Sequence, residues 1–221
     1  MREQGSDRTP RYARYAARLA RPFPNFDMPF AGPLRREAAR LLCLKQGDRV
    51  LDAGCGMGGS FPYLVDAVGP FGEVIGVEIS PEMTINAMRR VKRHRWRNVR
   101  VIEAAAQKVA LTGTFDGLLM LGAPDVYASE EALANITPHM KDGARIVLFG
   151  AKTSGTRVGL FLNVLVRWAL SRLAFPTTPR PDSEPWRLVA QHVRGLEVEE
   201  RSFGAMFLAS GTYAGRGIVG P

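Results

Sequence analysis

The sequence contains little cysteine and no long apolar run. Cys43 and Cys55 are the two cysteines among 221 residues, so we expect neither a disulfide framework nor a metal site. The longest apolar stretch, Val158 to Val166, is interrupted by Asn163 and is too short to span a bilayer. The first residues also lack the apolar segment of a signal peptide. These absences predict a cytoplasmic protein.

Negative charge is also in short supply. The chain contains 30 Lys and Arg residues and 21 Asp and Glu residues, which gives a formal net charge of +9 and a pI of about 10.1. Such an excess favours an anionic partner, either nucleic acid or an anionic membrane, and charge alone does not decide between them. Hydrophobic residues make up 46% of the chain, which is typical of one globular domain.

Apolar segments alternate with helical patterns along the chain. Buried strands are predicted at 49–53, 73–79, 99–104, 115–121 and 144–150, and a closing hairpin at 196–203 and 205–212. Helices are predicted at 32–47, between the first strand and Gly69, from Ser80-Pro81 onward, at 130–140 and at 183–193. Strands that are apolar on both faces and separated by helices indicate a parallel sheet covered on both sides. The sequence therefore predicts a doubly wound α/β fold.

A glycine-rich turn follows the first predicted strand. It reads Asp52-Ala-Gly54-Cys55-Gly56-Met-Gly58-Gly59, and glycine allows the backbone to approach a ligand closely. Gly54, Gly56 and Gly59 also have the G-x-G-x-x-G spacing of dinucleotide sites, a weak signal alone. Asp52 argues against a pyrophosphate there, because its charge suits a ligand that carries an ammonium and a sulfonium. A tight turn that binds nothing is the structural alternative.

Glu78 ends the second predicted strand, 22 residues after Gly56. In doubly wound folds an acidic side chain at this position accepts hydrogen bonds from ribose hydroxyls. The alternative is a surface carboxylate at a strand end. Together with the glycine turn, Glu78 predicts a site for an adenosyl group.

The segments VLDAGCGMG and VIGVEISPEM resemble the cofactor motifs of class I S-adenosylmethionine (SAM)-dependent methyltransferases. FDGLLML and MKDGARIVLFG resemble the later motifs, so the likeness extends over residues 34 to 152. The ubiquinone/menaquinone C-methyltransferases and the bacterial phospholipid N-methyltransferases are the most similar groups. The resemblance implies a Rossmann-like seven-stranded sheet whose last strand is antiparallel, in agreement with the terminal hairpin.

The same resemblance implies where SAM binds. Gly54 and Gly56 would flank its methionine part, Glu78 would hold the ribose, and Ile79 and Met83 would pack on the adenine. The remaining residues that we predict to bind the cofactor are Asp52, Cys55, Ala106, Gln107 and Leu121. One position departs from the family pattern, because relatives carry an aspartate for the adenine amino group where this chain has Ala105. Gln107 or the backbone would have to replace it.

Candidate catalytic residues follow the fourth predicted strand, at the carboxyl edge where ligands bind. Asp125 could act as a base or cap a helix, and Tyr127 could orient an acceptor or pack in the core. His192, in the predicted late helix, is a third candidate with a surface position as its alternative. Because SAM is already activated, methyl transfer mainly requires alignment and exclusion of water, and a base is optional.

Two further segments could contact the acceptor or a surface. Residues 157–180 are predicted to form a helical lid inserted into a domain at 32–221, and residues 1–31 a partly disordered flap. The lid segment is nearly apolar around its circumference, so a membrane-surface helix and a core or dimer contact are its alternatives. The densest basic run lies around Trp96, between Arg89 and Arg97, and would contact RNA or anionic lipid if it is more than a solvated helix end.

The sequence thus predicts a SAM-dependent methyltransferase for a small, largely hydrophobic acceptor such as a quinone, lipid or secondary metabolite. Peripheral contact with an anionic membrane is a further expectation, nucleic acid is not expected as a partner, and a homodimer is compatible with the sequence. One rival is an RNA or protein methyltransferase, favoured by the charge. The other, motivated by Ala105, is a SAM-fold protein without methyl transfer that acts as a binding subunit or cyclase.

Overall fold

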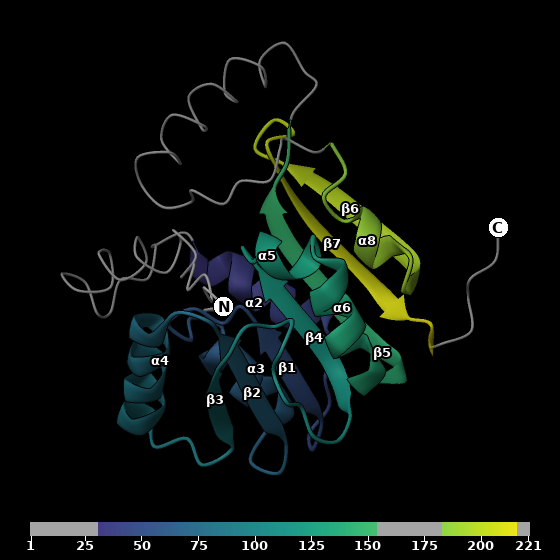
Figure 1. Cartoon of the computed structure of the whole chain (residues 1–221). Coiled ribbons are helices and arrows are strands. Elements are labelled where there is room, and N and C mark those ends of the chain that lie inside the picture. The colour runs from purple at the N-terminus through teal and green to yellow at the C-terminus, as the bar shows by residue number, and fades with distance from the viewer. Residues whose placement is uncertain (1–30, 154–182, 216–221) are drawn as a thin grey trace, which may run out of the picture.

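The computed structural model of the chain describes residues 31–153 and 183–215, which form one seven-stranded sheet of order β3-β2-β1-β4-β5-β7-β6 (Figure 1). The strands are β1 (Arg49–Ala53), β2 (Glu73–Glu78), β3 (Val99–Glu103), β4 (Phe115–Leu121), β5 (Met140–Ala151), β6 (Val193–Arg201) and β7 (Met206–Tyr213). β1 to β5 are parallel, and β7 lies antiparallel between β5 and β6. The predicted doubly wound, mostly parallel sheet with an antiparallel last strand is confirmed.

Helices cover both faces of the sheet. α2 (Ala31–Leu41), α3 (Phe61–Val68) and α4 (Pro81–His94) pack on one face. The other face carries α5 (Pro124–Tyr127), α6 (Glu130–Ile136) and α8 (Arg187–Ala190). Successive residues of β1 belong to different core clusters, with Val50 on the α3 side and Leu51 on the α6 side. This is why the central strands read as continuous apolar runs.

Local signals place several boundaries where the sequence predicts them. Ser80 caps α4, because its hydroxyl accepts a hydrogen bond from the Met83 N–H at 3.4 Å, and Pro81 occupies the first turn. Gly69 ends α3 with a φ of +63°, which a side chain would disfavour. The β-strand bounds differ from the predicted ones by a few residues, apart from the earlier start of β5 at Met140.

Three of the helix predictions are wrong in their lengths. The helix expected at 130–140 ends at Ile136 and continues as the short 3-10 helix η1 (Thr137–His139), which contains a proline that cannot extend an α-helix. The helix expected at 32–47 ends at Leu41, and the one expected at 183–193 is reduced to α8. The four-residue α5 was not predicted, because so short a helix has no periodicity to detect.

Two side chains tie α2 to the later part of the chain. Arg201, at the end of β6, donates to both carboxylate oxygens of Glu37 at 2.7 and 2.8 Å. Arg145, in β5, donates from Nε to the carbonyl of Leu41 at 3.1 Å. A bidentate guanidinium–carboxylate pair fixes orientation as well as distance. The position of α2 therefore depends on strands that lie more than 100 residues away in the chain.

The predicted flap (1–31) and lid (157–180) lie outside the described residues, apart from Ala31. No helix within the described ranges has the length and apolar character needed to cross a membrane.

Candidate functional site

The strand order reverses between β1 and β4, and a crevice opens at the carboxyl ends of these strands. Ligands of doubly wound folds bind at such a reversal. The lining residues come from the ends of β1, β2, β3 and β4 and from α5: Gly54, Val77, Glu78, Ile79, Ala104, Ala106, Gly122, Ala123, Asp125 and Val126. Five residues predicted from the sequence are thus brought together, namely Gly54, Glu78, Ile79, Ala106 and Asp125.

The two central glycines of the turn are required for different reasons. Gly54 has a φ of +80°, and a Cβ there would lie 2.5 Å from the Cβ of Ala123, so the turn after β1 packs directly on the chain that leaves β4. Gly56 has a φ of +54°, and a Cβ there would meet nothing nearer than the sulfur of Met83, at 3.9 Å. Gly54 therefore allows two parts of the protein to pack against each other, whereas Gly56 leaves open space beside Met83.

Glu78 supports the glycine turn and lines the crevice. Its Oε2 accepts a hydrogen bond from the Gly56 N–H at 3.0 Å, and its Oε1 accepts one from the Ser80 N–H at 2.9 Å. The side chain is 3% exposed, and burial raises its pKa to about 7 even though these hydrogen bonds act in the opposite direction. Each oxygen keeps a second lone pair for a ligand hydroxyl.

Asp52 lies at the floor of the same turn. Its side chain is 1% exposed, and its Oδ2 accepts no hydrogen bond from any group within the described residues. Burial raises the pKa of Asp52 to about 7, the positive charge of Arg35 opposes this shift, and the charge of Glu78 adds to it. A buried carboxylate oxygen without a donor is costly, so this atom fits a site that a cationic ligand completes.

Arg35 belongs to the site and was missed by the sequence analysis. Its guanidinium occupies the space into which a Cβ of Gly59 would project, and its charge acts on Asp52. Burial lowers the pKa of Arg35, which shows how far the side chain is withdrawn from water. A signal was available, because Arg35 falls on the apolar stripe of α2 formed by Ala31, Ala38 and Leu42.

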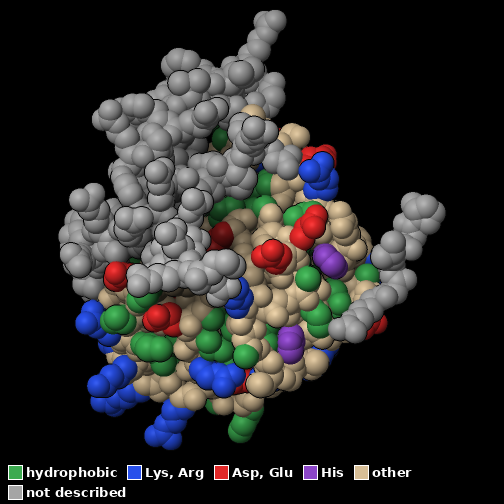
Figure 2. Space-filling model, viewed as in Figure 1, with side chains coloured by type: hydrophobic (Ala, Val, Ile, Leu, Met, Phe, Trp, Pro, Cys, Tyr) green, Lys and Arg blue, Asp and Glu red, His purple; other side chains and the backbone are tan. Residues whose placement is uncertain are grey.

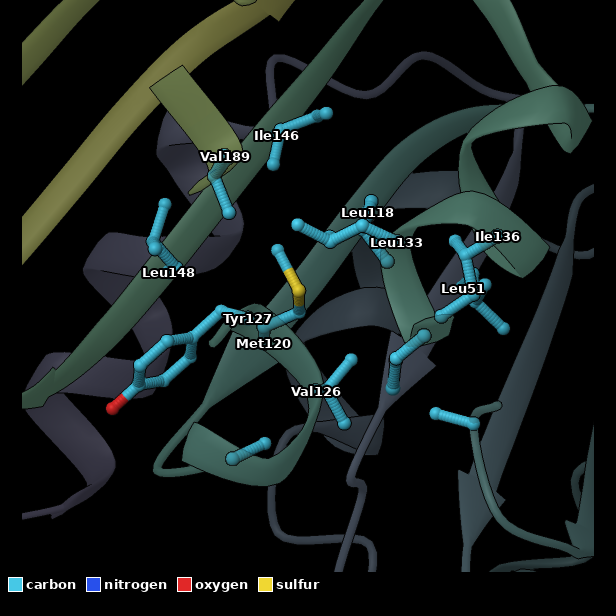
Figure 3. Close-up of a cluster of buried hydrophobic side chains, with 14 of the residues drawn as sticks. Leu51, Leu118, Met120, Val126, Tyr127, Leu133, Ile136, Ile146, Leu148 and Val189 are labelled. Carbon is cyan, nitrogen blue, oxygen red and sulfur yellow. The ribbon is translucent and has the colours of Figure 1, made fainter. Parts of the chain in front are cut away.

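The short helix α5 separates the two candidates that follow β4. Asp125 lines the crevice, and burial raises the pKa of its carboxyl. Tyr127 is 2% exposed and belongs to a cluster of buried apolar side chains (Figure 3). Its ring lies 5.9 Å from that of Phe207 in an edge-to-face arrangement. Two residues along an α-helix differ by about 200° around its axis, so one faces the crevice and the other the core. The structure does not bring Tyr127 to the crevice.

His192 lies away from the crevice, in the turn between α8 and β6. The next residue, Val193, pairs with Tyr213, and the neighbouring Thr212 pairs with Arg145 at the start of β5. This is the edge of the sheet where the parallel strands begin, opposite the edge that carries the crevice.

The remaining predicted cofactor residues are not among the residues that line the crevice. Cys55 and Leu121 direct their side chains into the core cluster on the α3 side. Met83 stands at the first turn of α4, near Gly56. The side-chain amide nitrogen of Gln107 donates to the Asp125 carbonyl at 3.0 Å and to the Ser129 hydroxyl at 3.3 Å. Gln107 therefore holds α5 in place with its amide nitrogen. We expected Gln107 to replace the aspartate that binds adenine in relatives, and its side-chain carbonyl oxygen is the atom left for that contact.

These charges define a ligand with complementary groups. Asp52 presents a carboxylate to an ammonium, Arg35 a guanidinium to a carboxylate, and Glu78 oxygens to a diol. The methionine and ribose parts of SAM carry these three groups, so the residues present fit this cofactor. A pyrophosphate would bring negative charge next to two buried carboxylates, which disfavours a nicotinamide dinucleotide.

Comparisons with known proteins agree with this site. A methyltransferase domain family matches residues 50–143. A demethylmenaquinone methyltransferase of Geobacillus sp. (strain WCH70) is 27% identical over 118 residues, which cover 51% of this chain and 49% of that protein. A 23S rRNA (uracil(1939)-C(5))-methyltransferase of Acinetobacter baumannii (strain AB0057) is 47% identical over 57 residues, 26% of this chain and 12% of that protein. The chain thus spans half or less of the length of these relatives.

Among solved structures, a SAM-dependent methyltransferase from Aquifex aeolicus has the same fold. It superposes with a TM-score of 0.58 at 19% identity and covers 91% of this chain and 98% of that one. The N-methyltransferase NodS from Bradyrhizobium japonicum WM9 gives a TM-score of 0.58 at 15% identity and covers 85% and 98%. Residues 50–143 therefore match a methyltransferase domain, as the motifs predict, and the chain has the fold of SAM-dependent methyltransferases.

Proposed function

We propose that this chain transfers the methyl group of SAM to a small, largely apolar acceptor. The observation that carries the proposal is the lining of the crevice: beyond Glu78 its walls are small or aliphatic, and Asp125 is the other carboxylate among the lining residues. Of the lining residues not assigned to SAM, Ala104, Ala123 and Val126 offer no hydrogen-bonding side chain, which favours an acceptor recognised by shape and apolar contact.

The likeness to known proteins supports the same class of acceptor. The match to demethylmenaquinone methyltransferases extends over about half of this chain, whereas the match to the rRNA enzyme extends over about a quarter. The match to the demethylmenaquinone methyltransferase covers more of both proteins, so we give it more weight for the acceptor.

The residues of the chain hold SAM in one orientation. Glu78 accepts the ribose hydroxyls, Asp52 pairs with the ammonium, and Arg35 pairs with the carboxylate. SAM supplies an activated methyl group, so the protein mainly aligns the acceptor with it and excludes water. Both carboxylates, with a pKa of about 7 when no ligand is bound, are held ionised by a ligand that carries two positive charges.

Asp125 is the proposed base for an acceptor that loses a proton. It stands on α5 at the wall of the crevice, and burial raises the pKa of its carboxyl above the ordinary value, which makes the carboxylate a stronger base. Tyr127 contributes packing beneath this helix, and His192 takes no part because it lies at the opposite edge of the sheet.

The test is methyl transfer from labelled SAM to fractionated cell extract by the purified full chain. We expect label in the fraction of apolar small molecules, and none with the variant Glu78→Ala, which lacks the ribose contact. Label in the RNA or protein fraction would instead establish the rival acceptor class. SAM binding by titration calorimetry without transfer to any fraction would identify a binding protein that has lost methylation.

A further inference from the structure

Most of the net positive charge of the chain is concentrated in one segment. Residues 89–100 contain seven Lys or Arg residues and no acidic one, so they contribute +7 of the net charge of +9 and leave +2 for all other residues. The segment comprises the last turns of α4, the turn after it and the start of the edge strand β3. The charge asymmetry is therefore local and belongs to one corner of the fold.

The side chains of this segment point outward. Six of its basic residues are exposed: Arg89, Lys92, Arg93, Arg95, Arg97 and Arg100. Five of them, all except Arg93, form no ion pair with a carboxylate of the described residues. Figure 2 shows Lys and Arg side chains gathered at the lower left of the molecule, beside apolar side chains. Their mutual repulsion is not offset within the described part of the fold.

Apolar side chains are exposed on the same side. Ile85 and Met88 are 45% and 48% exposed, and with Arg89 and Lys92 they have the spacing of one helix face. The fully solvated Phe71, 90% exposed, lies in the turn before β2. The Asn98 amide bonds the carbonyls of Gly69 and Gly72 at 2.8 and 3.1 Å, so this turn is held against the basic segment.

Trp96, the aromatic residue within the basic run, contacts other side chains of the protein with its ring. Trp96 stacks on His94 with ring centroids 4.5 Å apart, and its edge contacts Phe61 of the core. Proteins that bind single-stranded RNA usually offer open aromatic faces to the bases. Aliphatic side chains next to cations are instead typical of surfaces that lie on anionic lipid.

We propose that the outer face of α4, with the turns at 69–72 and 95–98, docks on an anionic phospholipid bilayer. The basic side chains would attract the phosphate headgroups, while Ile85, Met88 and Phe71 would enter the boundary of the acyl region. We call these residues the α4 surface: Phe71, Ile85, Met88, Arg89, Lys92, Arg93, Arg95, Arg97 and Arg100.

Docking of the α4 surface is compatible with use of the crevice. α4 begins at Ser80, two residues after Glu78, and its C-terminal end lies at the opposite edge of the sheet. A bilayer along the outer side of α4 would lie beside the crevice without covering the strand ends. The inference does not depend on the identity of the acceptor.

The test is sedimentation of the full chain with vesicles of phosphatidylcholine alone or of phosphatidylcholine and phosphatidylglycerol in equal parts. Each basic residue near an anionic bilayer strengthens binding by about five-fold, so Lys92→Glu with Arg95→Glu should weaken binding at least about 25-fold. The matched control is Arg40→Glu with Arg194→Glu, which changes the net charge equally at exposed sites on α2 and β6, outside α4 and the turns at 69–72 and 95–98. Thermal unfolding verifies that each variant is folded.

A second pair of variants tests the apolar contribution and distinguishes a bilayer from RNA. Ile85→Ser with Met88→Ser should weaken binding to the mixed vesicles about ten-fold and leave binding to a single-stranded RNA oligonucleotide unchanged. If the charge-reversed pair fails to fold, Arg97→Gln with Arg100→Gln takes its place.

Three results would overturn the proposal. They are equal binding to both kinds of vesicle, equal loss in the matched control, and an RNA affinity that depends on Lys92 and Arg95 while vesicle binding does not.

Discussion

Replacement of Asp52 by asparagine should stabilise the ligand-free protein and weaken SAM binding. The side chain is 1% exposed and its Oδ2 accepts no hydrogen bond within the described part of the chain, so asparagine keeps the shape and removes a buried charge. Burial raises the pKa of Asp52 from 3.8 to about 7. At 1.36 kcal/mol per pH unit, the ionised side chain therefore lowers the free energy of unfolding by roughly 4 kcal/mol at pH 8. Burial of the new amide offsets about 1–3 kcal/mol of this, so we expect a net gain of about 1–3 kcal/mol.

The gain should depend on pH with a definite sign. Between pH 3.8 and about 7 the folded state keeps a proton on Asp52 that the unfolded state has released, so protein stability falls as the pH rises through this window. Above pH 7 the full cost of the buried charge is present, and the benefit of Asp52→Asn is largest. Urea unfolding at pH 8 and pH 5 measures both values, and we expect the difference between variant and parent to be smaller at pH 5.

SAM affinity should change in the opposite direction. The variant loses a charged hydrogen bond to the ammonium, worth about 1.5–3 kcal/mol, which predicts binding about 10- to 100-fold weaker by titration calorimetry. Asp66→Asn is the matched control, because Asp66 is an exposed carboxylate on α3 and should change neither property. A destabilised Asp52→Asn protein at pH 8, or unchanged SAM affinity, would refute the assignment of Asp52 as an unsatisfied carboxylate that the ligand completes.

Three further predictions concern the other residues of the site. Gly54→Ala should lower the melting temperature, because its Cβ collides with Ala123, whereas Gly56→Ala should mainly weaken SAM binding, and parallel melting and titration would separate the two effects. Glu78→Gln should weaken SAM binding about 10- to 100-fold. In the parent, affinity should rise between pH 6 and pH 8 as Glu78 and Asp52 ionise, and a flat profile would contradict their pKa values of about 7. Tyr127→Phe should keep the kcat of the parent, because Tyr127 does not line the crevice, whereas Tyr127→Ala should cost about 3–5 kcal/mol in urea unfolding because it removes a buried ring.

Much of the sheet and half of the crevice could be predicted from local patterns. Strands buried on both faces leave uninterrupted apolar runs, and Ser80-Pro81 marks a helix start by backbone chemistry alone. Glu78 could be paired with the glycine turn because both positions follow from a known strand arrangement, and its hydrogen bond to the Gly56 N–H confirms that they meet. These features depend on neighbours in sequence or on one βαβ unit.

Features that depend on packing between distant segments could not be predicted. The apolar stripe of α2 indicates that Arg35 faces inward, but its contact with the glycine turn depends on how α2 packs against α3, which no local pattern specifies. Tyr127 turned inward because a four-residue helix rotates it away from Asp125, and that helix is too short for periodicity to reveal. His192 was expected in a long helix, but α8 ends at Ala190 and the chain enters β6 at the far edge.

The pairing of Glu37 with Arg201 has a consequence for the order in which the molecule is completed. During synthesis α2, the helix that carries Arg35 and Glu37, leaves the ribosome early. Arg201 of β6, which pairs with Glu37, is synthesised 164 residues later. The nucleoside side of the crevice, built by β1 and β2, can form long before the amino-acid side is fixed. A nascent or C-terminally truncated chain should therefore recognise adenosine better than it distinguishes SAM from analogues that lack the methionine carboxylate.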